Sequence, residues 1–264
     1  MSKQNDIEID DFPSIGGVMA SKMITEEHKK PIFMYREKRY SPNDSGWRIY
    51  SGLESEEYSN NPDNFGFYNP STILAVDSSI AELLLKGGVG SVFERKSDES
   101  SWHKVDDYPL EDDYMVKHPL TDEWELTINN LFERQIEEDG ELFYTTGDKS
   151  LRMVIWNREE NKADLYKEYQ EAITNRDESP SKTLETFDFS DDKVIRIGYL
   201  IKESNENREY SLLCGFSIID KQVVLATFYF DDPNDISWAV DTWKGIALIE
   251  ECPLNGGHGM TALP

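Results

Sequence analysis

Residues 209–230 read EYSLLCGFSIIDKQVVLATFYF and carry the clearest structural pattern of the chain. Two runs rich in β-branched and aromatic residues, Glu209–Ile219 and Gln222–Phe230, flank the pair Asp220-Lys221. Such runs are typical of β-strands, and a two-residue connection between them is typical of a tight hairpin. The stretch therefore predicts two neighbouring antiparallel strands.

Further strands and two helices are expected on either side of this hairpin. The expected strands are Glu123–Ile128, Leu142–Thr146, Leu151–Asn157, Thr183–Phe189 and Lys193–Lys202. Apolar residues at helical spacing predict helices over Ala163–Asn175 and Asn234–Ile249. Their expected apolar stripes are Leu165, Tyr169, Ala172 and Ile173 in the first helix and Ile236, Val240, Trp243 and Ala247 in the second. This order of elements predicts an α+β fold, in which helices pack on an antiparallel sheet.

The first half of the chain shows a second, smaller α+β pattern. The expected strands are Val18–Ile24, Pro31–Tyr35, Gly46–Tyr50, Thr72–Val76, Val89–Arg95 and Trp102–Val105. Asp77 is a good N-cap for a helix over Ser78–Lys86, and Gly87-Gly88 would end that helix.

Between the halves, residues 106–113 read DDYPLEDD, an acidic stretch with a proline and no helical or strand periodicity. Such a stretch is typical of a linker. The expected organisation is a mobile tail over 1–14, an α+β domain over 15–107, a linker over 108–117, a second α+β domain over 118–252 and a mobile tail over 253–264.

The charge balance is strongly acidic, with 52 Asp and Glu against 27 Lys and Arg and a net charge of −25. Binding to phosphate backbones or anionic lipids needs clustered Lys and Arg, so neither nucleic acid nor membrane is expected as a partner. The charge would steer basic protein partners toward the chain, or it would only keep the chain soluble. Charge alone does not decide between these two interpretations.

The cysteines and the N-terminal sequence indicate the cellular compartment of the protein. The two cysteines, Cys214 and Cys252, make neither a disulfide framework nor a zinc site. The N-terminal sequence MSKQNDIEIDDFPS has no apolar stretch of the signal-peptide kind, and no run approaches a membrane span. Cytoplasmic localisation is expected.

Catalytic and cofactor motifs are weak or missing. The glycines of 86–91 lack the Lys-Ser/Thr that completes a phosphate loop, so a helix stop is favoured there. The four histidines have no metal-ligand spacing. The acidic loops Asp188–Asp192 and Asp231–Asp235 are candidates for calcium, but they depart from the known loop pattern and a solvated turn is favoured. We therefore expect no catalytic residue, cofactor or resident metal, although a carboxylate pair would be hidden among so many acids.

Several motifs in the first half occur together in a specific order. They are Gly17–Lys22 (GVMASK), Met34–Glu37 (MYRE), Asp44–Gly52 (DSGWRIYSG), Glu57-Tyr58, Asn61–Asn64 (NPDN) and Gly90–Arg95 (GSVFER). With these motifs, residues 15–107 resemble a bacterial domain family that was long catalogued as of unknown function and is now grouped with the immunity proteins of polymorphic toxin systems. The resemblance implies binding, because an immunity protein holds a cognate toxin inactive inside the cell that makes it. It implies no catalytic residue and identifies no toxin.

The second half shows a weaker resemblance, at the level of fold. Its element order, with Leu151–Trp156 and a final helix that contains Trp238 and Trp243, is similar to PsbP-like or DcrB-like domains. Fold-level similarity says little about function.

The candidate partner-binding residues come from the DSGWR motif and from two acidic loops. Trp47 and Tyr50 have opposite strand parity, so one is expected in the core and the other exposed or at the domain interface. Arg48 and Arg95 are expected to pair with Glu94 or Asp63, and a structural role is favoured over toxin contact for each arginine. The candidates are Glu54, Glu56, Glu57, Asp63, Trp47, Arg48, Asp106, Asp107, Glu111, Asp112 and Asp113.

The function favoured by these observations is binding and neutralisation of a toxin or secreted effector, which would be basic if the net charge matters. The alternatives are a non-catalytic adaptor or scaffold module and, with less support, a carboxylate-dependent hydrolase. The oligomeric state does not follow from the sequence.

Overall fold

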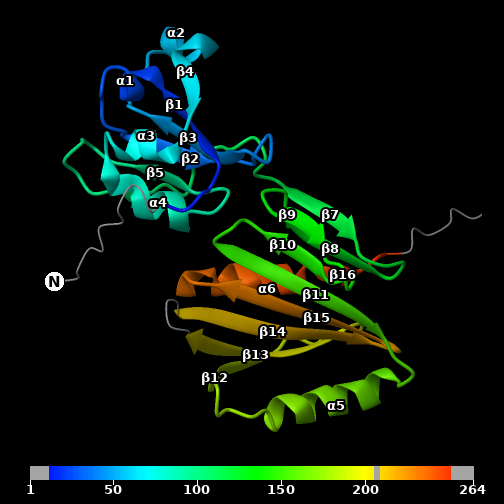
Figure 1. The fold of residues 1–264 in the computed structure, drawn as a ribbon. Helices are drawn as coiled ribbons and strands as arrows, with labels where there is room; N and C mark the ends of the chain where they lie inside the picture. The colour runs from blue at the N-terminus through cyan, green and yellow to red at the C-terminus, as the bar shows by residue number, and fades with distance from the viewer. Residues whose placement is uncertain (1–11, 205–208, 251–264) are drawn as a thin grey trace, which may run out of the picture.

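The computed structural model describes residues 12–204 and 209–250 (Figure 1). Residues 1–11 of the expected N-terminal tail, the expected tail 253–264 and Cys252 lie outside the described residues. We refer to residues 12–107 as the N-terminal region, blue to cyan-green in Figure 1, and to residues 115–250 as the C-terminal region, green to orange.

The N-terminal region is built on a six-stranded mixed sheet in the order β4-β1-β3-β2-β5-β6. Its strands are β1 (Gly17–Ser21), β2 (Phe33–Arg36), β3 (Asp44–Tyr50), β4 (Phe65–Tyr68), β5 (Val92–Glu94) and β6 (His103–Lys104). Its helical segments are α1 (Lys22–Thr25), α2 (Glu56–Ser59), η2 (Pro62–Asn64), α3 (Pro70–Leu74), η3 (Ser78–Ile80) and α4 (Ala81–Lys86). Strand β1 pairs in parallel with β3 and antiparallel with β4, which makes the sheet mixed.

The C-terminal region contains a seven-stranded antiparallel sheet and a three-stranded one. The larger sheet has the order β12 (Thr183–Asp188), β13 (Ile195–Ser204), β14 (Glu209–Ile219), β15 (Gln222–Phe230), β11 (Lys149–Asn157), β10 (Leu142–Thr145), β9 (Glu133–Ile136). The smaller has the order β16 (Ile246–Leu248), β8 (Trp124–Asn129), β7 (Met115–Pro119). Its helical segments are α5 (Lys162–Thr174), η4 (Pro233–Asp235) and α6 (Ile236–Lys244). Both regions mix helices with sheets, and this confirms the predicted α+β class.

Two cores hold the C-terminal layers together. One lies between the larger sheet and the layer of α6 and β8, where Trp124, Phe228 and Trp243 are fully buried. The other lies on the opposite face of the sheet, where Leu165 and Tyr169 of α5 are buried against it. The alternation of side chains along β14 and β15 supplies both cores, which is why these strands read as continuous apolar runs. The β14–β15 hairpin has the predicted bounds.

Three predicted elements differ from the structure. The segment Thr72–Val76 is wrong as a strand, because Asn69 caps the Ser71 amide and Pro70 begins helix α3. The strand expected over Val18–Ile24 stops at Ser21, which caps α1 through its side chain. The last helix ends at Lys244, and Ala247 lies instead in β16.

Strands β4, β7 and β9 were not expected from the sequence. Each is short, and β7 and β9 are mostly exposed, so apolar alternation hardly marks them. Strand β7 begins at Met115, inside the stretch expected as a linker.

The two regions contact each other through main-chain and side-chain groups. The Val89 amide donates to the Thr146 carbonyl at 2.7 Å. Lys38 Nζ donates to Asn130 Oδ1 at 3.2 Å. Gly88 lies so close to Asp148 that a Cβ on Gly88 would be 1.7 Å from Asp148 Oδ1. The junction therefore depends on a residue without a side chain.

Within the described residues, no helix has both the length and the apolar character needed to cross a membrane.

Candidate functional site

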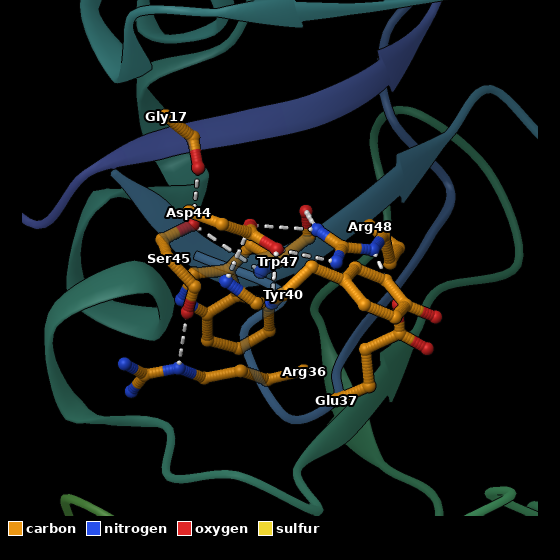
Figure 2. A network of polar contacts seen from close by, with 9 residues as sticks. Gly17, Arg36, Glu37, Tyr40, Asp44, Ser45, Trp47 and Arg48 are labelled. Carbon is orange, nitrogen blue, oxygen red and sulfur yellow. Dashed lines mark hydrogen bonds and ion pairs between the residues drawn. The ribbon is translucent and has the colours of Figure 1, made fainter. Parts of the chain in front are cut away.

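The DSGWR motif is the start of β3, and its first two side chains tie this start to neighbouring parts of the chain (Figure 2). The Asp44 carboxylate accepts hydrogen bonds from the amides of Gly46 at 2.8 Å and Tyr40 at 3.1 Å. Ser45 Oγ donates to the Gly17 carbonyl of β1 at 2.7 Å. These bonds tie the motif to both neighbouring chain segments.

Gly46 is required by the backbone conformation at the start of β3. Its φ is +82°, in the left-handed region that favours glycine, and an added Cβ would lie 2.2 Å from the Glu37 carbonyl oxygen. The close approach lets the Glu37 amide donate to the Gly46 carbonyl at 3.0 Å.

Arg48 is the centre of a buried polar network. Its guanidinium donates two hydrogen bonds to Asp44, at 2.9 and 2.7 Å, and one to Glu37 at 2.6 Å. The rings of Tyr40 and Phe67 lie 5.4 and 5.8 Å from its guanidinium carbon. Only 1% of Arg48 is exposed, so the ion pair lies in a low-dielectric setting where a bidentate geometry matters most.

The network keeps both partners charged. Burial alone would raise the pKa of Asp44, but the hydrogen bonds from Arg48 and from the Gly46 and Tyr40 amides together lower it below its usual value. Burial likewise opposes the charge on Arg48, but the bonds to Asp44 and Glu37 raise the pKa of the guanidinium. The pair is therefore ionised at neutral pH.

A second buried ion pair joins Arg95 to Asp77. Arg95 also donates Nε to the Pro31 carbonyl at 2.8 Å and lies 4.7 Å from the centre of the Trp102 ring. Burial would raise the pKa of Asp77, but bonds from Ser79 and Arg95 lower it.

The expectation that Arg48 and Arg95 pair with Glu94 or Asp63 is therefore wrong. Glu94 pairs with His103 at 2.9 Å on the surface, and Asp63 is exposed in η2. The arginines instead form ion pairs with carboxylates that lie at turns and helix caps in the folded chain.

Trp47 lies on the other face of β3 from Arg48. It is fully buried, and its Nε1 donates to the Leu84 carbonyl of α4 at 3.2 Å. Tyr50 is half-buried and faces the opposite side. The prediction that one of these two rings is in the core is confirmed.

Arg36 connects the motif to the junction between the regions. It donates to the carbonyls of Ser45 at 2.9 Å and Gly87 at 2.7 Å, and its guanidinium carbon lies 5.8 Å from the Trp47 ring centre. Burial lowers the pKa of Arg36, and the charge of Asp148 partly offsets that effect. Among the described residues, no carboxylate forms an ion pair with Arg36.

A cleft of about 1000 Å³ lies beside this arginine and is shared by the two regions. The N-terminal region contributes segments 12–17, 42–45 and 67–71, and the C-terminal region contributes Glu133 and the turn 145–147. Arg39 and Glu133 form an ion pair of 2.9 Å at its rim. The cleft thus adjoins the DSGWR motif, and its lining is mainly polar.

The remaining candidate residues lie in two separate loops. Glu54 is half-buried and accepts from the Ser51 amide and hydroxyl, each at 2.8 Å, so it shapes its own loop. The exposed candidates are Glu56, Glu57, Asp63, Asp106, Asp107, Glu111 and Asp113. Asp112, half-buried, and Asp113 accept hydrogen bonds from the side-chain amides of Asn130 and Asn129 at 2.9 and 2.7 Å. Trp47 and Arg48 are interior residues, so they support a surface rather than form it.

Groups suited to metal binding do not gather in the part of the chain that the structure describes. No cluster of His, Cys, Asp and Glu there could hold a metal ion. Burial raises the pKa of the Cys214 thiol to about 11, which keeps it protonated. In the two loops considered for calcium, Asp191 accepts from the Lys193 and Val194 amides, each at 2.8 Å, and Asp235 pairs with Lys149 at 2.7 Å.

Sequence reasoning missed Arg36 and Glu37 as contributors to this site. It also missed Tyr108, whose ring centre lies 5.4 Å from that of Tyr35, the residue that pairs with Arg48 across β2 and β3. Arg36 and Glu37 lie in the quoted MYRE motif, and strand parity from Met34 would have placed Arg36 beside Trp47. Tyr108 lies in the expected linker, where no periodicity indicates which way its ring points.

Three comparisons with known proteins bear on this region. Residues 18–106 match the sequence profile of the Immunity protein Imm33 domain. No curated protein sequence matches the chain.

Two solved structures align with about half of this chain. The solution structure of cyanobacterial PsbP (CyanoP) from Synechocystis sp. PCC 6803 aligns with a TM-score of 0.40 and 8% identity, over 52% of this chain and 94% of that chain. The 1.9 Å crystal structure of the Saccharomyces cerevisiae Ran-binding protein Mog1p aligns with a TM-score of 0.31 and 11% identity, over 49% of this chain and 84% of that chain. At these values neither likeness bears on function. Residues 18–106, which contain both buried ion pairs, are thus similar to the Imm33 immunity protein domain.

Proposed function

We propose that this protein neutralises a cognate bacterial toxin by binding it in the cytoplasm of the cell that produces both. The observation that carries the proposal is the Imm33 immunity domain over residues 18–106. The protein acts as a stoichiometric, non-catalytic inhibitor, and the toxin is a basic protein.

The charge of the chain supports the basic character of the partner. A net charge of −25 attracts a cationic protein over a distance of about 10 Å at moderate salt and speeds the encounter. A stable complex of this kind buries about 1,200–2,000 Å² in total.

Rescue of growth tests the proposal. The protein encoded beside this chain is expressed in a bacterial host with and without it, and the purified pair is examined by size exclusion with light scattering. We expect growth arrest that co-expression relieves, together with a one-to-one complex. Arrest that persists although both proteins are expressed and folded would contradict the proposal.

A charge-reversal variant outside the N-terminal region provides a matched control for this assay. Glu171 is exposed on α5, in the C-terminal region, so Glu171→Lys is expected to rescue growth as well as the wild type does.

A further inference from the structure

One face of the N-terminal sheet carries a continuous row of aromatic side chains. Residues paired across neighbouring strands face the same side of a sheet. Phe67 pairs with Met19, Met19 with Arg48, and Arg48 with Tyr35. In the next row, Tyr50 pairs with Phe33. We name this side, opposite to Trp47, the outer face.

The helical segments α1, α3, η3 and α4 pack on the other side of the sheet. Their buried residues belong to the core that contains Trp47 and Ile49, and they are Ile24, Ile73, Leu74, Ile80 and Leu84. The outer face is therefore the side of the sheet that these residues leave uncovered.

The rings of the outer face contact one another in an unbroken series. Tyr108 lies 5.1 Å from Phe33, Phe33 lies 6.1 Å from Tyr50, and Tyr50 lies 5.6 Å from Phe65 between ring centres. The series ends at Tyr58 of α2, 5.9 Å from Phe65. All five rings are half-buried, so each keeps an accessible edge or face. Burial raises the pKa of Tyr108, which keeps its hydroxyl neutral.

The aromatic rings at the centre of the outer face are held in place by their neighbours, and a ring at its edge is exposed to solvent. Tyr35 stacks on Tyr50 at 6.0 Å and 13°, and Arg48 is fixed beneath the face by its two carboxylates. Phe67, at the edge of the face, is 58% exposed. A pre-ordered aromatic surface loses little conformational entropy on binding, and for this reason tyrosine is enriched at protein interfaces.

The two ends of the row lie in the two acidic loops. Residues 53–64 surround Tyr58 and contain four acidic residues, and residues 105–114 surround Tyr108 and contain five. Neither stretch contains a Lys or Arg. The apolar row is thus flanked at both ends by negative charge.

We propose that the outer face is the surface that docks the toxin, and that it takes a protein segment with an apolar or aromatic centre flanked by Lys and Arg. The inference rests on the proposed function and adds the surface and the chemistry of the partner. Cations of the partner would meet the carboxylates of the two loops and the faces of the rings. A second copy of this chain does not fit, because two such faces would bring like charges together at both ends.

Variants of residues with accessible rings or carboxylates test the surface. Phe67→Ala and Tyr58→Ala each remove an accessible ring, and Glu56→Lys with Glu57→Lys reverses the charge at one end. We expect each ring variant and the charge variant to weaken toxin binding at least about tenfold, as for truncation of an interface residue that carries much of the binding energy. The controls Leu184→Ala and Ile136→Ala remove apolar side chains that are 59% and 67% exposed in the C-terminal region, and they should change affinity less than about twofold.

Hydrogen exchange of the wild-type chain tests the docking surface without relying on the folding of any variant. Amide hydrogen exchange of the complex is expected to slow in residues 53–59 and 105–110 relative to the free chain. If the wild type binds and rescues while the outer-face variants bind equally well and the footprint falls elsewhere, the docking surface is refuted and the proposed function stands. If the wild type neither binds nor rescues, the proposed function itself fails. A dimer of this chain that Phe67→Ala dissociates would also overturn the choice of partner.

Discussion

The Arg48 guanidinium offsets the free-energy cost of burying the charged Asp44 carboxylate. In Arg48→Met, Asp44 stays buried and loses two hydrogen bonds, so we expect the free energy of unfolding to fall by about 3–5 kcal/mol. Urea denaturation measures the change. Arg39→Met is the matched control, because its partner Glu133 lies in an exposed pair and its loss should cost at most about 1 kcal/mol. Equal losses in the two variants would contradict the buried-pair interpretation.

The stability of the folded chain at low pH depends on the buried carboxylates of Asp44 and Asp77. The pKa of Asp44 and that of Asp77 are lower in the folded chain than the value of about 3.9 for an unfolded Asp. A depressed folded pKa contributes stability that is complete above the unfolded pKa and is lost as the pH falls through the folded pKa. The free energy of unfolding should therefore decline below about pH 4, and Asp77→Asn should reduce the slope. Exposed Asp63 serves as the comparison, and a slope that Asp63→Asn changes as much as Asp77→Asn would refute this assignment.

At the residue scale, side-chain direction was predictable and ion-pair partners were not. Opposite parity was enough to place Trp47 and Tyr50 on opposite faces of the strand, because alternation depends only on the strand, but it did not say which ring is buried. The partner of Arg48 depends on the positive φ at Gly46, and no spacing rule indicates how such a backbone conformation aims the Asp44 carboxylate.

At the scale of elements, the start of β3 depends on Gly46 for two separable reasons. Gly46→Ala meets both an unfavourable φ and the Glu37 carbonyl 2.2 Å away. Gly140→Ala meets only the unfavourable φ, +87°, because no atom lies within 4 Å of its Cβ position. We expect about 1–2 kcal/mol of destabilisation for Gly140→Ala and at least about 1 kcal/mol more for Gly46→Ala. Thermal unfolding of both variants measures the difference, and similar losses would show that the close approach relaxes freely.

Elements with strong periodicity could be read from the sequence, and short ones governed by caps could not. Strands β14 and β15 and helix α5 are long enough for their patterns to dominate. Residues Thr72–Val76 are apolar and β-branched, yet Asn69 and Pro70 start a helix just before them. Strand β4 has four residues, and its role becomes visible only when it pairs with β1.

On the scale of the whole molecule, the junction couples the two regions through Gly88. Gly88→Ala forces the Asp148 carboxylate away and breaks its 2.6 Å bond from Thr146 Oγ1. We expect a loss of about 1–3 kcal/mol and a calorimetric transition that broadens or splits. The double variant Gly88→Ala with Asp148→Ala should recover most of the loss, because the smaller side chain leaves room for the new methyl group. Additive losses in the double variant would exclude this contact as the cause.

Net charge acts at the same scale, on the rate of complex formation. Screening shortens the reach of the −25 charge as salt rises. Between about 0.05 and 0.5 M NaCl, the association rate constant for the toxin should fall about tenfold or more, with a smaller change in the dissociation rate constant. Stopped-flow fluorescence measures both, and a salt-independent association rate would contradict a basic partner.

The position of β1 has a consequence for the order of events during synthesis. Although β1 leaves the ribosome first, it lies between β3 and β4, so its antiparallel neighbour exists only after Tyr68 has been made. Tyr108, the far end of the aromatic row, is made later still. At bacterial elongation rates, the interval between the synthesis of β1 and that of Tyr108 is on the order of ten seconds. Under the proposed function, a cell that starts to translate this chain and a cognate toxin together has no complete docking surface during that interval.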